Sequence, residues 1–133
     1  MFPRRQGIPG DELPAVLPTP QIVWRDDGTV IAVPSIALYS TGCEIQIVGA
    51  LRDDRNMAAE EVSRRLDMLR MNGSPVQMLS GERIDHGFRY RAWVPFAPGE
   101  SDCVFTLGEG PAICVDRDRV AEAADKVTRL VWT

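Results

Sequence analysis

Two segments of the chain alternate apolar and polar residues with a period of two, and this pattern constrains the fold more than any other feature. Residues 43–51 place cysteine, isoleucine and leucine side chains on one face and Glu44 and Gln46 on the other. Residues 88–96 place phenylalanine, tyrosine, alanine and valine on one face and two arginines and a tryptophan on the other. Such alternation predicts antiparallel strands with one dry and one wet face.

Several shorter segments bounded by turn residues are predicted as further strands. The clearest pair is joined by Asp26-Asp27-Gly28, where we expect Gly28 to adopt the positive φ of a tight hairpin turn. Together these strands cover residues 21–25, 29–33, 36–39, 102–107 and 112–115.

Residues 56–70 break the alternation and predict a helix, because their apolar residues recur at helical spacing and Asn56 is a suitable N-cap. A competing interpretation makes 66–71 a strand that turns at Asn72-Gly73 into residues 76–79. A second helix is predicted over 118–128, capped by Asp116 or Asp118. We expect the apolar residues that follow it, Leu130-Val131-Trp132, to dock on the core.

The chain has 133 residues, which suits one domain of ordinary soluble composition. The predicted fold class is mainly β (α+β): a two-layer antiparallel β-sandwich of about seven or eight strands, with one internal and one C-terminal helix. Residues 1–20 carry five prolines and predict a proline-rich N-terminal arm, whereas residues 21–133 form the single β-sandwich domain. The arm is either a disordered leader or a segment that lies on a partner subunit or on the domain itself.

Three cysteines lie far apart and lack a metal-ligand spacing, which predicts reduced, buried thiols. If Gly108-Glu109 forms a two-residue loop, Cys103 and Cys114 oppose each other across a hairpin. A register shifted by one residue removes that pairing, so no disulfide is expected.

The C-terminal part of the chain resembles a group of small uncharacterised bacterial proteins. The resemblance is carried by Arg91-Ala92-Trp93-Val94-Pro95-Phe96-Ala97-Pro98-Gly99, by the strand pair and Asp-led helix that follow, and by the closing Leu130-Val131-Trp132. It implies a β-sandwich and no particular activity. The turn at residues 95–98 is less rich in proline than in that group.

Charge and hydropathy narrow the range of partners. The net charge of -4 disfavours nucleic acid and anionic membranes, which reward a basic surface. No apolar run is long enough for a membrane-spanning helix, and the first residues lack the apolar stretch of a secretion signal, so we expect a cytoplasmic protein.

No catalytic or metal-binding arrangement stands out. His86 is the single histidine, and although a Cys–His site can be imagined, the sequence favours an exposed loop histidine. Acidic pairs at 26–27, 53–54 and 116–118 are explained as turn formers or helix caps rather than calcium ligands. We therefore expect no cofactor and no bound metal, and the sequence favours a binding protein over an enzyme.

The candidate binding residues are Arg89, Arg91 and Trp93, which share one face of one strand. Arginine and tryptophan supply much of the energy of protein interfaces, although arginines lying over an indole also occur on ordinary solvated strands. The sequence thus predicts a non-catalytic protein-interaction or structural module whose partner is a protein, including a copy of itself, bound through the sheet face and the arm.

The alternative is a small-ligand-binding sandwich, or a modest enzyme, with a pocket between the sheets near Arg83 to Trp93. Phe88, Tyr90 and Phe96 would line that pocket and the loop at residues 83–87 would gate it. A filled sandwich interior favours the interaction module.

Overall fold

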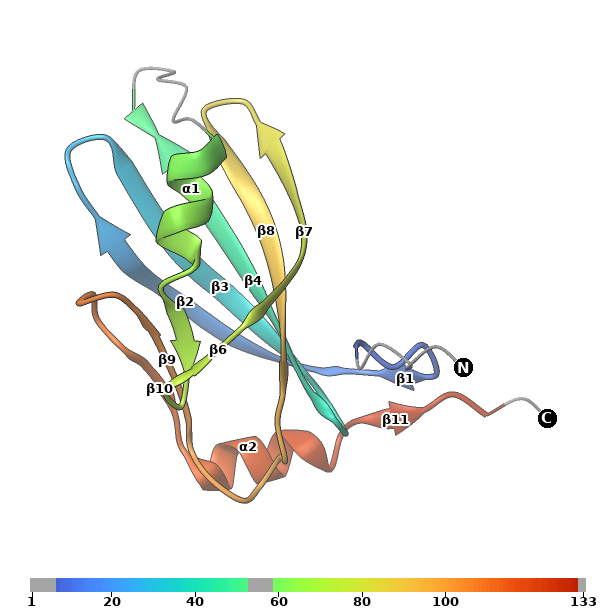
Figure 1. Cartoon of the computed structure of the whole chain (residues 1–133). Coiled ribbons are helices and arrows are strands. Elements are labelled where there is room, and N and C mark those ends of the chain that lie inside the picture. Colours follow the sequence, from blue (N-terminus) through green and yellow to red (C-terminus); the bar gives the residue numbers. More distant parts are fainter. Residues whose placement is uncertain (1–6, 53–58, 132–133) are drawn as a thin grey trace.

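A curved five-stranded antiparallel sheet forms one layer of the molecule (Figure 1). The computed structural model describes residues 7–52 and 59–131. The sheet contains β2 (Ala15–Arg25), β3 (Thr29–Tyr39), β4 (Gly42–Leu51), β7 (Gln77–Ile84) and β8 (Gly87–Pro95), in the spatial order β2-β3-β4-β8-β7. The two edges of the sheet are therefore β2 and β7.

A smaller four-stranded sheet and two helices lie against one face of the large sheet, which we call the inner face (Figure 1). The small sheet has the order β10 (Ile113–Val115), β9 (Cys103–Leu107), β5 (Leu69–Met71), β6 (Ser74–Pro75). The helices are α1 (Ala59–Leu66) and α2 (Arg117–Ala124), and a third sheet pairs β1 (Glu12–Leu13) with β11 (Thr128–Arg129).

The predicted fold class, mainly β with antiparallel sheets and two helices, is confirmed. The described residues contain eleven strands rather than seven or eight, because several strands are only two or three residues long. No helix in the described part of the chain is both long and apolar enough to cross a membrane.

The core lies between the inner face and the small sheet, and it is built from the alternation seen in the sequence. On β4, Cys43, Ile45 and Ile47 are buried and face inward. In the pairing with β8, Cys43 lies opposite Val94 and Ile45 lies opposite Ala92. The second layer contributes buried residues that close this core: Leu66, Leu69, Met71, Cys103, Phe105, Leu107, Ile113, Val115, Val120 and Ala123. Each apolar side chain removed from water in this way stabilises the fold by about 1.5–3 kcal/mol.

Prolines open the ladder between β2 and β3 without ending either strand. β3 continues through Pro34, and the register shifts between Pro18 and Gln21 on β2, because proline lacks the N–H that a ladder requires. The hydroxyl of the buried Thr19 donates to the carbonyl oxygen of Val33 at 3.3 Å and satisfies one acceptor in the gap. The sequence pattern predicted that the second strand of this pair ends at Val33, whereas β3 continues past Pro34 to Tyr39.

The N-terminal segment contacts its own chain from Asp11 onward. β2 begins at Ala15, so residues 15–20, which the sequence reading assigned to the arm, form part of the sheet edge. Before that, Glu12–Leu13 pairs with β11, and the Glu12 carboxylate accepts a hydrogen bond from the Ser40 N–H at 2.9 Å.

The segment after residue 58 combines both sequence interpretations. A helix forms as predicted, but it ends at Leu66, and Leu69–Met71 is a strand. Asn72 and Gly73 have φ of 49° and 81°, the left-handed pair of a hairpin turn, and so they end a strand rather than the helix. The predicted N-cap, Asn56, lies outside the described residues.

The C-terminal segment differs from its prediction. Asp116 is the N-cap of α2 and accepts a hydrogen bond from the Arg119 N–H at 2.9 Å, but the helix ends at Ala124. Leu130 and Val131 are exposed rather than docked on the core, because the chain leaves α2 to pair with β1 instead. Trp132 lies outside the described residues.

The predicted hairpin between β2 and β3 forms, but a carboxylate rather than a left-handed glycine stabilises its turn. Gly28 does not adopt a positive φ. Instead, Asp26 Oδ1 accepts hydrogen bonds from the N–H groups of Gly28 and Thr29 at 2.9 and 2.8 Å. Asp26 Oδ2 forms an ion pair with Arg65 of α1, whose guanidinium lies 5.1 Å from the ring centroid of Trp24. This cluster ties α1 to the hairpin.

The register of the β9–β10 hairpin separates the two cysteines. Cys103 pairs with Val115 and Cys114 pairs with Val104, so the thiols lie on opposite faces. Cys43 and Cys103 are buried as predicted, whereas the prediction was wrong for Cys114, which is exposed. All three are free thiols.

We expect Gly110→Ala to lower the free energy of unfolding by about 2 kcal/mol, because the turn after β9 packs directly on β2. A Cβ at Gly110 would lie 1.9 Å from the carbonyl oxygen of Val23, so backbone would have to move. Urea unfolding of both proteins measures the difference. Gly10→Ala is the matched control, since a Cβ there meets nothing within 4 Å; equal losses in the two variants would contradict this packing.

We expect Asp26→Asn to destabilise the protein by about 1 kcal/mol at neutral pH, since the asparagine keeps an acceptor for the turn but loses the charge opposite Arg65. The Arg65 guanidinium and the Gly28 N–H hold the pKa of Asp26 far below its ordinary value of 3.8.

The stabilising effect of the Asp26 carboxylate is therefore complete above that ordinary value, declines below it and disappears only below the lowered folded pKa. Unfolding measured from neutral pH down to about pH 2 should show the wild-type and variant curves converging. A difference that stays constant over this range would exclude the ion pair as its source.

Candidate functional site

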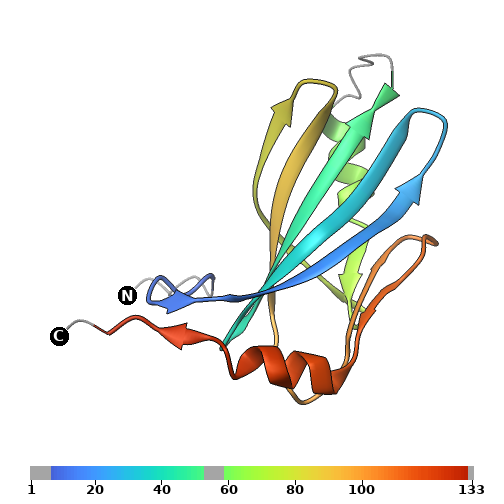
Figure 2. The same cartoon turned by 180° about the vertical axis from the view of Figure 1, so that it is seen from behind.

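The outer face of the five-stranded sheet, which is the face turned away from the core, carries all three binding residues predicted from the sequence. Figure 2 shows this face with no helix in front of it. Arg89, Arg91 and Trp93 of β8 lie opposite Val48, Gln46 and Glu44 of β4, in that order. The three side chains share a face but differ greatly in their environments.

Trp93 is buried rather than presented to solvent. It is 1% exposed, and its ring meets the Tyr39 ring edge-on, with centroids 5.8 Å apart and an interplanar angle of 62°. A Cβ on Gly42 would lie 2.5 Å from the indole, so glycine is needed beside it. Among the residues that the structure describes, none forms a hydrogen bond with the indole Nε1. Trp93 is therefore a buried structural residue rather than an exposed binding residue.

Arg91 and Glu44 form a bidentate ion pair on this face. Arg91 Nε donates to Glu44 Oε1 at 3.0 Å and Nη2 donates to Oε2 at 2.8 Å, and Gln46 also donates to Oε1. The carboxylate is buried, whereas the side chain of Arg91 is 48% exposed. Glu44 raises the pKa of Arg91, and burial raises the pKa of Tyr39 with a further contribution from Glu44. Sequence alternation placed Glu44 on the wet face, but it could not show that strand pairing buries it.

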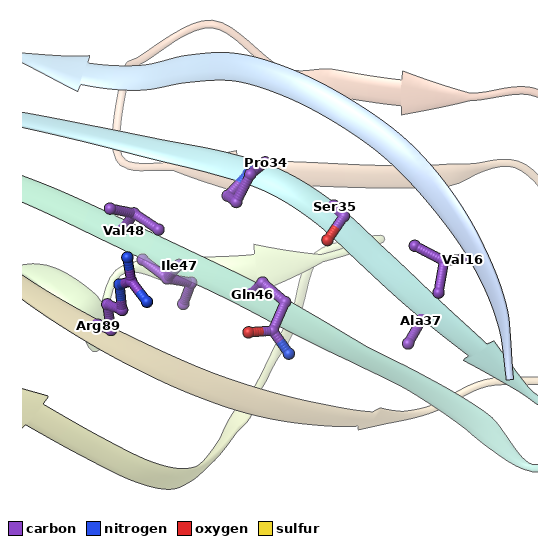
Figure 3. Close-up of a pocket in the computed structure, with 8 residues that line it drawn as sticks. All are labelled: Val16, Pro34, Ser35, Ala37, Gln46, Ile47, Val48 and Arg89. Carbon is purple, nitrogen blue, oxygen red and sulfur yellow. The ribbon is translucent and has the colours of Figure 1, made fainter. Parts of the chain in front are cut away.

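Arg89 is exposed and lies where two hollows of the outer face meet. The first hollow has a volume of about 530 Å³ and lies over β2, β3, β4 and β8 (Figure 3). Its lining is mainly apolar and consists of Val16, Pro34, Ser35, Ala37, Gln46, Ile47, Val48 and Arg89. Figure 3 shows β2 arching away from β3 above this hollow, where the prolines open the ladder. Val16 at its rim is 63% exposed.

The second hollow, of about 410 Å³, lies on the same face toward β7 and is more polar. It is lined by Gln46, Ser80, Gly81, Glu82, Arg89, Tyr90 and Arg91. Because Gln46 and Arg89 line both hollows, we treat the two as one open groove, called the outer groove below. The contributions of β2, β3 and β7 carry no local signal in the sequence, because only the strand order brings these strands to this face.

The aromatic side chains predicted to line a pocket between the sheets lie against the core. Phe88 is buried and meets Tyr90 edge-on, with ring centroids 5.6 Å apart, and Phe96 packs against the same core. Both hollows described above lie on the outer face rather than between the layers. The aromatic residues proposed to line an inter-sheet pocket therefore pack in the core.

His86 and the buried thiols do not form a catalytic pair. His86 occupies the exposed β7–β8 turn with φ of 62°, and its carbonyl oxygen accepts the Leu51 N–H at 2.7 Å. Leu51 and Cys43 lie at opposite ends of β4, about 27 Å apart at the usual rise per residue. Burial raises the pKa of Cys43, and it raises that of Cys103 to about 12, so both thiols stay protonated at neutral pH.

The acidic pairs that the structure describes form the turn and the helix cap expected for them. Asp26 stabilises the hairpin turn and Asp116 caps α2, while residues 53–54 lie outside the described range. Across residues 7–52 and 59–131, no three histidine, cysteine or acidic side chains gather as metal ligands would.

Comparison of the chain with protein-family models, with curated proteins and with solved structures found no match. The resemblance of the C-terminal part to small bacterial proteins therefore stays a prediction.

We expect Arg91→Met to lower the free energy of unfolding by about 1–2 kcal/mol, because it leaves the buried Glu44 carboxylate without its cation. Chemical denaturation measures the loss, and Arg89→Met, on the same strand and face, should change stability by less than about 0.5 kcal/mol. Adding Glu44→Gln to Arg91→Met should recover part of the loss. Equal effects of the two arginine substitutions would contradict the role of the ion pair.

Proposed function

We propose that this chain is a non-catalytic interaction module that binds a protein partner through the outer groove. One observation carries the proposal: the apolar rim at Val16 and the exposed Arg89 border an open groove on the outer face of the large sheet. Exposed apolar side chains beside arginine are typical of protein interfaces. The N-terminal segment docks beside the β3–β4 turn. There it can extend the surface that contacts the partner.

The charges around the groove favour a protein partner over nucleic acid. Arg89 and Arg91 are balanced on the same face by Glu82 and Glu44, so the groove has no excess of positive charge. Counterion release, which dominates binding to phosphate backbones, would therefore contribute little to binding at this groove. We also propose, from the sequence, that the protein is cytoplasmic.

A small organic ligand is the second candidate. The volume of the first hollow, about 530 Å³, lies within the range of ligand pockets. A ligand in this hollow would lie on the outer face of the large sheet. Small-molecule pockets typically bury most of the surface of their ligand. The outer groove is open along the sheet, so a protein segment fits it better than a small molecule does.

The test is binding of the full chain to partners identified by cross-linking in extracts of its source cells. With each purified partner, Arg89→Glu should weaken binding about tenfold or more, as expected for an arginine at the centre of an interface. The matched control is Arg64→Glu on the exposed side of α1. If Arg89→Glu binds every partner as the wild type does, the outer groove is not the interface and the proposal fails.

A further inference from the structure

The two edges of the five-stranded sheet are protected very differently. β2 contains Pro18 and Pro20, and neighbouring elements cover it: Gln21 donates to the carbonyl oxygen of Ala112 at 2.9 Å, and Gly110 packs against Val23. β7 contains no proline, six of its eight residues are exposed, and β8 is the one described strand that pairs with it. Uncovered strand edges are templates for pairing with another chain.

The direction of the backbone groups on β7 follows from the neighbouring ladder. At the two ends of the β4–β8 pairing, Leu51 N–H donates to His86 O at 2.7 Å and Phe96 N–H donates to Thr41 O at 3.2 Å. In an antiparallel ladder such residues alternate, so Arg89 and Arg91 turn their backbone groups toward β7.

The partners of those two arginines on β7, Glu82 and Ser80, consequently turn their backbone groups toward β8. Gly81 lies between them and turns its N–H and its C=O outward, at an exposed position. Another extended strand could pair with both of these outward groups.

We propose that β7 pairs antiparallel with β7 of a second copy of this chain, with the twofold axis at Gly81. In this register each Gly81 N–H donates to the Gly81 carbonyl oxygen of the other copy. The outer face stays continuous across the axis, because residues of the same face then oppose one another.

Charge favours this register over the one centred on Glu82. With Gly81 on the axis, the Ser80 hydroxyl of each copy lies opposite the Glu82 carboxylate of the other and can donate to it. A shift that centres the pairing on Glu82 would instead set two carboxylates directly opposite each other, which is unfavourable.

Pairing at β7 also joins two outer grooves. Ser80, Gly81 and Glu82 line the second hollow, so the grooves of the two copies would meet across the axis on one ten-stranded sheet. This inference stands on the strand edge and does not depend on what the groove binds. A strand edge alone is a small interface, so we expect a dimer whose population rises with protein concentration.

Sedimentation velocity over a wide range of concentrations tests the proposal with two opposite substitutions at one position. Ser80→Glu places carboxylates opposite Glu82 of the other copy and should raise the dissociation constant of the dimer about tenfold or more. Ser80→Lys places an ammonium there and should leave the dimer as tight or tighter. Within one copy, residue 80 faces Arg91, so the carboxylate variant retains a favourable neighbour and should fold.

Amide hydrogen exchange of the wild-type chain provides a test without any variant, since protection of the Gly81 N–H should increase with protein concentration. Val16→Asp, which alters the groove rim and not the edge, should leave the dimer unchanged and so separates this proposal from the one above. A chain that stays monomeric at every concentration would overturn the inference. So would a dimer that responds alike to both Ser80 substitutions or leaves Gly81 unprotected.

Discussion

The exclusion of water from the inner face of the large sheet is the constraint on which the rest of the structure depends. Because β4 and β8 alternate, inward-facing positions of one strand lie opposite inward-facing positions of the other, and the second layer closes over both. No disulfide joins the cysteines, and within the described residues no metal-ligand cluster supplements this core. Hydrophobic burial is thus the main stabilising term, and it fixes which face remains available for binding.

The outer face is shaped by polar interactions that the core makes possible. Glu44 is held under a bidentate contact from Arg91, and Trp93 packs beside it against Tyr39. These groups make one part of the face rigid and leave Arg89 and Val16 as its accessible features. The prolines shape the part of this face near β2, since they bend β2 away from β3 and so form the first hollow.

The local pattern of the chain predicted the strands but not their neighbours. Residues 43–51 and 88–96 were assigned correctly because a period of two is visible in a short window. The contact between Glu44 and Arg91 depends on pairing between segments far apart in the sequence. The exposure of Leu130 and Val131 has the same origin, since β1, near the start of the chain, determines where the C-terminal segment lies.

The candidate site was predictable only in part for the same reason. Arg89, Arg91 and Trp93 were correctly placed on one face, but burial of Trp93 requires Tyr39 and Gly42 from another hairpin. The helix at residues 59–66 shows the limit of propensity, because the left-handed Asn72-Gly73 pair belongs to a strand turn and the helix ends several residues before it.

The pairing of β4 with β8 places the longest connection of the sheet at its centre. Hairpins join β2 to β3, β3 to β4 and β7 to β8, and each can form locally. The two halves meet only when residues 52–76, with α1 and the strands β5 and β6, have been looped out between them. Closing such a loop costs conformational entropy before any contact compensates for it, so docking of the two hairpin units should set the folding rate.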